Sequence, residues 1–298
     1  MWFLASDRKI QITDLVLSDN LSTYHNLISF TSVSKLYENK GKVESDFATF
    51  EVCVRNQTRM SDGKIKVDCV SKEVQDALSS TTAGYTGRTT VNGLFSKLGF
   101  NYRSDFQSNN SYFSIPECSL TTLFDNLTKY ASFANGGGAH FFMTADGVVH
   151  GYDYKLIKDK KKAYKIEGNL QSEQMNTDWL MYTPSEYVLF CWDNKNNFEK
   201  ETFAITKGFG RATVDINDTT GVWKDAAKQE LTNMFYNKWY SSHALNVSIP
   251  QGVQVMLGDL VDLNGLGQTY IVKSITTGIN ELRKMPEISA VLISNPMF

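Results

Sequence analysis

The segment after residue 218 constrains the fold most, because it sets one long helix before a closely spaced series of strands. Residues 219–240 have apolar side chains at helical spacing. This spacing predicts a helix with one apolar face, formed by Trp223, Ala227, Leu231 and Met234. Stretches rich in Val, Ile and Leu predict later strands at residues 253–263, 270–277 and 288–294. This part of the chain is therefore expected to be a β domain with one long helix packed against its barrel.

The length of 298 residues predicts two domains or three, and a hydrophobic share of 42% is enough to form their cores. A formal charge of -2 gives no reason to expect general affinity for nucleic acid or membranes. No apolar stretch approaches the roughly 18 residues of a membrane helix, and the apolar run at residues 1–6 is too short for a signal sequence. We expect assembly in a cytoplasm, with no stable insertion into a membrane.

Residues 1–71 have the pattern of a first β domain. Apolar and polar residues alternate around Val52 and around Val67, and an Asp62-Gly63 pair between them predicts a hairpin. The side chains expected in the core from the second of these strands are Ile65, Val67 and Cys69. Those expected on its wet face are Lys64, Lys66 and Asp68.

A polar segment at residues 34–46 interrupts this domain. Charges of both signs surround its two large apolar residues, so it buries little by itself and is expected to be a protruding hairpin or a mobile loop. If it contacts a partner, the candidate residues are Lys35, Leu36, Tyr37, Glu38, Lys40, Lys42 and Glu44.

From residue 72 the spacing of apolar residues becomes helical, and residues 72–157 form a candidate α/β connecting domain. Short helices are expected at residues 72–78 and 91–98, and a stronger one after Ser119. A run of three glycines ends that helix, and Asp146-Gly147 then predicts a hairpin with a type I′ turn. The lysine-rich run at 155–162 has little to bury and is expected to be a solvated linker into the third segment, residues 158–298.

The histidines and cysteines predict no metal site. His140 and His150 could face each other across the hairpin, but two ligands do not make a zinc site. The four cysteines are widely spaced, without a CxxC pair. Residues 193–201 have the oxygen-rich composition of a calcium loop, but Phe198 stands where the turn glycine belongs. We therefore expect no metal and no cofactor.

The carboxylates predict no catalytic pair. Asp259 and Asp262 are three positions apart on one predicted strand and so point to opposite faces. No GxSxG or HExxH motif is present. The sequence therefore favours a protein that is not an enzyme.

Three features, taken in order, resemble the hub proteins of phage tails and baseplates. The first is the β-rich opening that leads through residues 65–69 into short helices. The second is the helix from Leu120, a break of small residues, a Phe-rich strand and the Asp146-Gly147 turn. The third is the C-terminal order of helix, strand, Gly258-Asp259 strand, Tyr270-x-Val-x-Ser strand and closing strand.

The resemblance implies an α+β, β-rich fold of two tube-type split β-barrel domains joined by a small α/β domain. It also implies a virion protein that forms a homotrimer, in which six quasi-equivalent barrels match a six-fold tail tube to a three-fold spike. The implied partners are the tail tube ring, a separate spike or tip protein, and possible tape measure and baseplate wedge proteins. Genomic DNA would pass through the lumen, with Lys64, Lys66 and Asp68 as lumen-facing candidates.

Two other functions stay open on the sequence alone. One is a cell-wall-degrading enzyme of the tail tip, which a zymogram would reveal. The other is a carbohydrate-binding module that uses exposed aromatic side chains. A hub should form trimers, so a mass measurement separates it from both.

Overall fold

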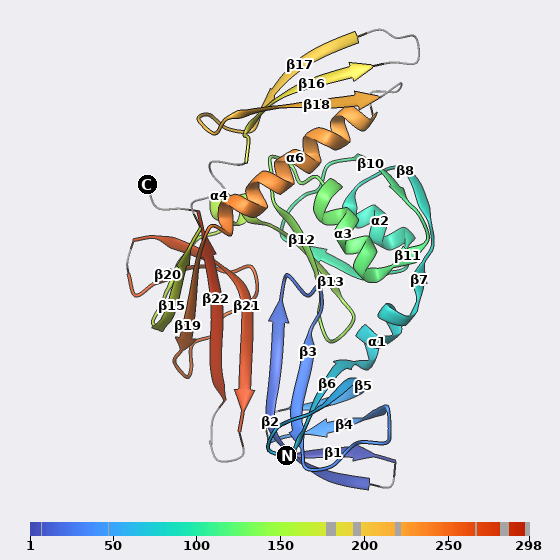
Figure 1. Ribbon diagram of the computed structural model, residues 1–298, viewed down its shortest axis with the longest axis vertical. Coiled ribbons are helices and arrows are strands. Elements are labelled where there is room, and N and C mark those ends of the chain that lie inside the picture. The colour runs from blue at the N-terminus through green and yellow to red at the C-terminus, as the bar shows by residue number, and fades with distance from the viewer. Residues whose placement is uncertain are drawn as a thin grey trace.

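The computed structural model describes residues 1–6, 8–46, 48–176, 183–192, 198–217, 222–265, 267–280 and 286–295. Residues 193–197, where the sequence predicts a plain hairpin turn, and Thr219, where it predicts the start of the long helix, lie outside these ranges. Two β units stand side by side, a helix-containing connecting unit lies above them, and a three-stranded sheet projects beyond it (Figure 1).

The first β unit is a closed six-stranded barrel. Its strands are β1 (Trp2–Ala5), β2 (Arg8–Asn20), β3 (Leu27–Ser32), β4 (Lys40–Glu44), β5 (Thr49–Arg59) and β6 (Ile65–Ser71). They pair in the order β1-β4-β5-β6-β3-β2, and β2 pairs again with β1. Val67 and Cys69 are fully buried inside and Lys66 is exposed, so the alternation predicted for β6 is confirmed.

The segment at residues 34–46 is part of this barrel, and the expectation of a loop that buries little is wrong. Residues 40–44 form β4, which pairs with β1 and β5 and buries Val43 completely. Leu36 is only 2% exposed and lies in the barrel core. Gln57 holds its backbone, accepting from the Leu36 N–H at 2.9 Å and donating to the Leu36 carbonyl at 2.9 Å.

The second β unit continues the sheet of the first. Its strands are β14 (Tyr164–Ile166), β15 (Asn169–Met175), β19 (His243–Ile249), β20 (Leu260–Leu263), β21 (Thr269–Ile279) and β22 (Glu287–Ser294). β2 pairs antiparallel with β21, from Leu15 opposite Ile279 to Asn20 opposite Ser274. The two units therefore join edge to edge in one 12-stranded sheet and do not stack face to face as a sandwich.

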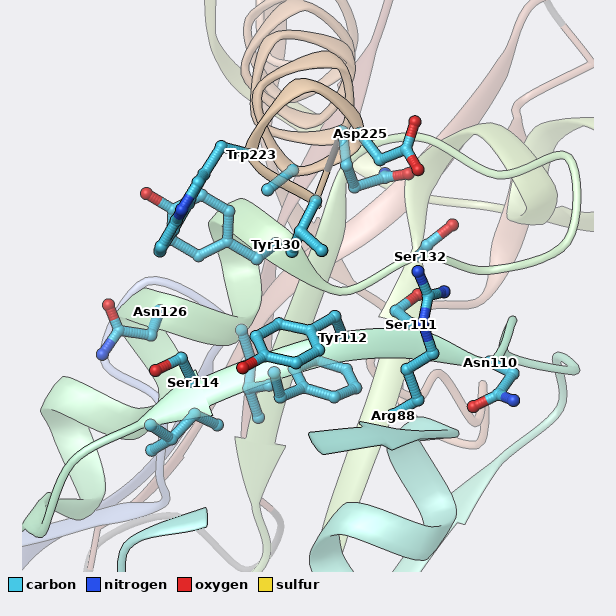
Figure 2. A pocket seen from close by; sticks show the side chains of 16 residues that line it. Arg88, Asn110, Ser111, Tyr112, Ser114, Asn126, Tyr130, Ser132, Trp223 and Asp225 are labelled. Atoms are coloured by element: carbon cyan, nitrogen blue, oxygen red, sulfur yellow. The ribbon is translucent and has the colours of Figure 1, made fainter. Parts of the chain in front are cut away.

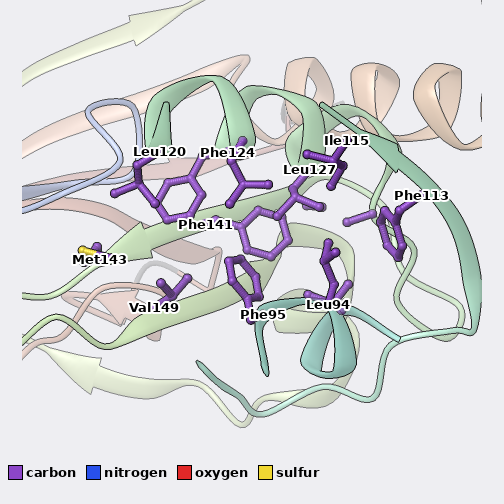
Figure 3. Close-up of a cluster of buried hydrophobic side chains, with 14 of the residues drawn as sticks. Leu94, Phe95, Phe113, Ile115, Leu120, Phe124, Leu127, Phe141, Met143 and Val149 are labelled. Carbon is purple, nitrogen blue, oxygen red and sulfur yellow. The ribbon is translucent and has the colours of Figure 1, made fainter. Parts of the chain in front are cut away.

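The connecting unit packs short helices over small sheets. Its elements are α1 (Lys72–Ser79), β7 (Thr81–Thr82), β8 (Tyr85–Thr89), α2 (Val91–Lys97), β9 (Tyr102–Ser104), β10 (Ser111–Ile115), β11 (Cys118–Ser119), α3 (Leu120–Tyr130), β12 (Ala139–Met143) and β13 (Val149–Asp153). The hydroxyls of Thr90 and Ser119 accept from backbone N–H groups in the first turns of α2 and α3, and both helices begin where the sequence predicts. Phe95, Phe124 and Phe141 meet in the core between the helices and β12 (Figure 3).

The hairpin of β12 and β13 forms where predicted, but its turn is wider than the predicted type I′ turn. Thr144 N–H donates to the Val148 carbonyl at 3.0 Å, and within the turn only Gly147 has a positive φ, of 78°. A type I′ turn needs positive φ at both central residues. The register also sets His140 opposite Tyr152 and not opposite His150, so the two histidines do not pair.

The lysine-rich segment after β13 is a helix, so the expectation of a solvated linker is wrong for these residues. Asp153 caps α4 (Tyr154–Lys160), which buries Leu156 and Ile157. The half-buried Lys158 ammonium donates to Thr269 Oγ1 at 2.9 Å, to Ser294 Oγ at 3.1 Å and to the Thr269 carbonyl. Burial lowers the pKa of Lys158 to about 8. This helix therefore fixes the connecting unit against β21 and β22.

The long predicted helix is α6 (Val222–Tyr240), and it lies beside a sheet of β16 (Glu186–Trp192), β17 (Phe198–Ala204) and β18 (Arg211–Asn217). Ala227 and Leu231 pack on this three-stranded sheet and not on the second β barrel, so the expected partner of these two residues is wrong. Trp223 and Met234 remain exposed, so their expected burial is wrong. The helix turns other sides toward α3 and α4, which breaks the single-face pattern.

Candidate functional site

One face of the 12-stranded sheet is open and polar across both β units. Side chains opposite each other in antiparallel pairs share a face, so the register identifies its members. This polar face consists of Asn56, Thr58, Lys66, Asp68, Ser29, Thr31, Thr13, Val16, Ser18, Ser274, Thr276, Gly278, Glu287, Ser289, Val291, Asn246, Ser248, Ser172 and Asn169. All but Thr31 and Ser274 are exposed or half-buried.

Small hydroxyl and amide side chains dominate the polar face. Its largest open apolar members are Val16 and Val291, which lie on different strands and are half-buried. Leu27 lies opposite Ser18 on the same face, but it packs against the core of the connecting unit. Its one cation, Lys66, lies 3.6 Å from the carboxylate of Asp68, so the pair adds little net charge. The face therefore presents hydrogen-bonding groups to water with neither a large apolar patch nor a cationic cluster.

Bulges in three strands determine which side chains point toward the polar face. The pairing of β2 shifts between Thr13 and Val16, with Asp14 at a positive φ of 52°. Strict alternation would turn Leu15 outward, whereas the bulge returns it to the core. β5 shifts between Val54 and Asn56, and β21 shifts between Val272 and Ser274. Each of these bulges resets the alternation so that the next polar residue faces outward.

The connecting unit covers the end of this sheet face that lies nearest to it. There Ile271 and Ile293 pack with Tyr154, Ile157 and other residues of the connecting unit. Below this cover, a hollow of about 230 Å³ lies over β15, β19, β21 and β22, and Ser172, Asn246 and Thr276 line it. The open area thus begins where α4 and the connecting unit end.

Two of the three lumen-facing candidates lie on the polar face, and the third does not. Lys66 and Asp68 belong to the polar face, next to Thr31 and Ser29 of β3. Lys64 precedes β6 and lies in the turn, 3.5 Å from Asp62. Whether any of them lines a channel stays a prediction.

The candidate partner-binding residues have unequal access. Tyr37 is 78% exposed and Lys35 is also exposed. In β4, Lys40 and Lys42 are exposed, and Lys42 lies 3.7 Å from Glu44. Glu38 is half-buried. Leu36 fills the barrel core and so cannot anchor a partner, which corrects that expectation.

The described residues contain no group of three or more His, Cys, Asp or Glu side chains placed to bind a metal ion. Burial lowers the pKa of His140 to about 3, which keeps this imidazole neutral. Asp259 accepts hydrogen bonds from the Tyr164 hydroxyl at 2.6 Å and the Met256 N–H at 2.8 Å, which is a structural role in a turn. Cys69 is a buried free thiol in the first barrel core.

Sequence reasoning missed Asn233, which joins α6 to the connecting unit. Its side-chain amide donates to the carbonyls of Lys129 and Ala131 at 2.9 and 3.0 Å, and its oxygen accepts from Gly138 N–H at 3.1 Å. It is 1% exposed. Its helical neighbours Gln229, Glu230 and Asn237 are also polar, so the sequence carries no signal of its burial and only the structure shows its partners.

Among the described residues, no helix is both long and apolar enough to span a membrane. No protein-family model matches the sequence, and no curated protein matches it.

Solved structures of phage tail proteins share the architecture described above. A tail protein from Neisseria meningitidis superposes with a TM-score of 0.61 at 12% identity, covering 98% of this chain and 95% of that chain. The 43 kDa tail protein of prophage MuSo2 from Shewanella oneidensis gives 0.59 at 11% identity, covering 99% of both chains. A prophage tail protein from Listeria monocytogenes gives 0.57 at 13% identity, covering 93% of this chain and 87% of that chain. The chain therefore has the fold of phage tail proteins, as the order of its motifs predicted.

Proposed function

We propose that this chain is a structural subunit of a phage tail, the hub at the end of the tail tube. The observation that supports this best is the polar face, which runs without interruption from the first β unit into the second. A monomer would also need polar side chains on a solvated sheet face, so what favours a ring is the alignment of this face across both units. A ring gains a continuous inner wall.

In the proposed ring, three copies surround a channel and the polar face lines it. Each copy contributes two β units joined edge to edge, so three copies present six units around the axis. Such a ring matches a six-fold tube on one side and a three-fold spike on the other, with closed interfaces. The likeness to solved tail proteins supports the same role.

The chemistry of the polar face suits a passage for DNA. Lysine and arginine side chains bind phosphates and would retain DNA, and large apolar patches would favour adhesion. The polar face instead has hydroxyls such as Thr276 and Ser289, and its one lysine is paired. Passage without specific binding is the expected result.

The proposed neighbours are the ring of the tail tube and a separate spike or tip protein, with tape measure and baseplate wedge proteins further away. The exposed residues of the 35–44 segment, Tyr37 foremost, are the proposed contact with the next ring. The proposed place of the protein is the virion tail, after assembly in the host cytoplasm. No catalytic step is proposed.

Light scattering on the purified protein tests the ring. The expected mass is three times the 33.6 kDa of one chain. A single-chain mass at every concentration, both alone and mixed with its tube protein, would reject the ring. Clearing of cell wall in a zymogram would favour the tail-tip enzyme instead.

A further inference from the structure

A cleft of about 380 Å³ lies away from the polar face, between β8 and β10, α3 and the first turn of α6 (Figure 2). Its floor is apolar and buried, formed by Phe113, Ile115 and Leu127. Its volume is within the range of ligand pockets, at the small end. The ring proposed above makes no use of it.

Aromatic side chains form two sides of this cleft. Tyr112 lies on β10, while Tyr130 at the end of α3 and Trp223 at the start of α6 face it from above (Figure 2). Trp223 is 54% exposed and Tyr112 is 37% exposed. Exposed rings grouped around one cleft indicate a binding surface, because isolated exposure would scatter them over the molecule. A flat ring offers an apolar face with a polar atom at its rim.

Polar side chains surround these rings. Within the described residues, neither hydrogen bonds nor ion pairs engage the side chains of Arg88, Asn110, Ser111, Ser114 and Asn126. Amides, hydroxyls and a guanidinium together supply donors and acceptors at several angles. Such groups match a ligand that has many hydroxyls, each both a donor and an acceptor.

The charges of the cleft favour a neutral ligand. Arg88 lies opposite Tyr112 in the β8–β10 pair, and Asp225 lies on the α6 side. One cation and one anion leave no excess charge for phosphate or for an ammonium group. A folded peptide side chain would call for an apolar pocket, whereas here the apolar surfaces are flat rings bordered by polar atoms.

We propose that this cleft binds a neutral oligosaccharide. The C–H faces of its sugar rings pack on Trp223 and Tyr112, and its hydroxyls bond to the amides and to Arg88. The site belongs to a single chain, so its binding does not depend on ring formation.

The test titrates three neutral trisaccharides, triacetylchitotriose, cellotriose and maltotriose, into the full-length protein and measures heat. At least one of these trisaccharides is expected to bind with a Kd below about 1 mM. Trp223→Ala and Tyr112→Ala are each expected to weaken that binding about tenfold or more, since each removes a stacking surface. Trp192→Ala is the matched control, because Trp192 is exposed to a similar 44% on β16, away from the cleft.

Three results would overturn the proposal. The first is no heat with any of the three sugars. The second is binding that both cleft variants leave intact, or that Trp192→Ala weakens equally. The third is a change in oligomeric mass in Trp223→Ala without any sugar binding by the parent protein, which would make the cleft a protein interface. Unchanged thermal unfolding of the variants verifies that each is folded.

Discussion

Burial and hydrogen bonds shift the pKa of the Asp153 carboxyl group in opposite directions. It caps α4, and its Oδ1 accepts from Leu156 N–H at 2.9 Å and from Gly137 N–H at 3.0 Å. Those bonds favour the carboxylate, but burial opposes it and dominates. The pKa of Asp153 is raised to about 6. The folded state therefore holds this proton more tightly than the unfolded chain does.

The sign of the resulting pH dependence follows from linkage. Between the unfolded pKa of 3.8 and the folded pKa of about 6, folding binds a proton, so the free energy of unfolding falls as pH rises. The contribution lost is on the order of 2–3 kcal/mol. We expect Asp153→Asn, which still caps the helix, to be more stable relative to the parent at pH 7 than at pH 4.

Thermal unfolding of both proteins at the two pH values measures this difference. Asp46→Asn serves as the control, because its carboxyl group is exposed. An offset between parent and Asp153→Asn that is the same at pH 4 and pH 7 would show that this carboxyl is ionised alike in both states.

Leu36 and Tyr37 are neighbours with opposite environments, and they separate a core role from a surface role. Leu36→Ala is expected to lower the free energy of unfolding by about 2–5 kcal/mol, because the side chain fills the barrel. Tyr37→Ala should change it by no more than about 0.5 kcal/mol. Chemical denaturation measures both, and a cost for Leu36→Ala as small as that for Tyr37→Ala would place Leu36 outside the barrel core.

At the scale of elements, Asn233 joins the end of α3 to α6. Helix C-termini leave carbonyls without partners, and Asn233 satisfies those of Lys129 and Ala131. Asn233→Ala would leave these two carbonyls and the Gly138 N–H buried without the hydrogen bonds that Asn233 provides. We expect a cost of about 2–4 kcal/mol in the free energy of unfolding.

Gln229→Ala is the matched control for Asn233, one turn earlier on α6. The Gln229 amide donates to Asn233 Oδ1 at 3.1 Å and is less buried. Denaturant titration should give a cost for Gln229→Ala well below that for Asn233→Ala. Equal costs would mean that packing of α6, and not the hydrogen bonds of Asn233, holds the helix in place.

Elements with a clear local pattern could be predicted from the sequence. The caps Thr90 and Ser119, the hairpin at Asp146-Gly147 and the inward position of Cys69 depend on neighbours in sequence, and the structure has all of them. Their signals are short-range hydrogen bonds and alternation, which need no knowledge of the rest of the fold.

Features that depend on distant partners could not be predicted. α4 looked like a solvated run because its lysines are charged, but Lys158 finds acceptors on β21 and β22. Residues 40–44 became a strand because β1 and β5 flank them. The bulges of β2 and β21 shift the alternation by one residue, so the full polar face emerges only from the pairing register.

At the scale of the whole molecule, the β2–β21 pairing fixes the two β units in one sheet. The place of β4 in the first barrel decides how the contact of residues 35–44 should be tested. Deleting the segment would remove β4 and open the barrel, so loss of assembly would say nothing about contacts. Lys35→Glu with Tyr37→Ala leaves the barrel intact, and we expect this double variant to fold normally but join the tube ring poorly in a co-sedimentation assay.

An electron cryo-microscopy reconstruction of the protein, alone or in an intact tail, tests the central claim most directly. We predict three copies around an axis, with the two β units of each alternating about a channel and with Thr276 and Ser289 facing its lumen. A reconstruction in which the chain is solitary, or in which the polar face is buried against another protein or turned to the outside of the ring, would contradict the account.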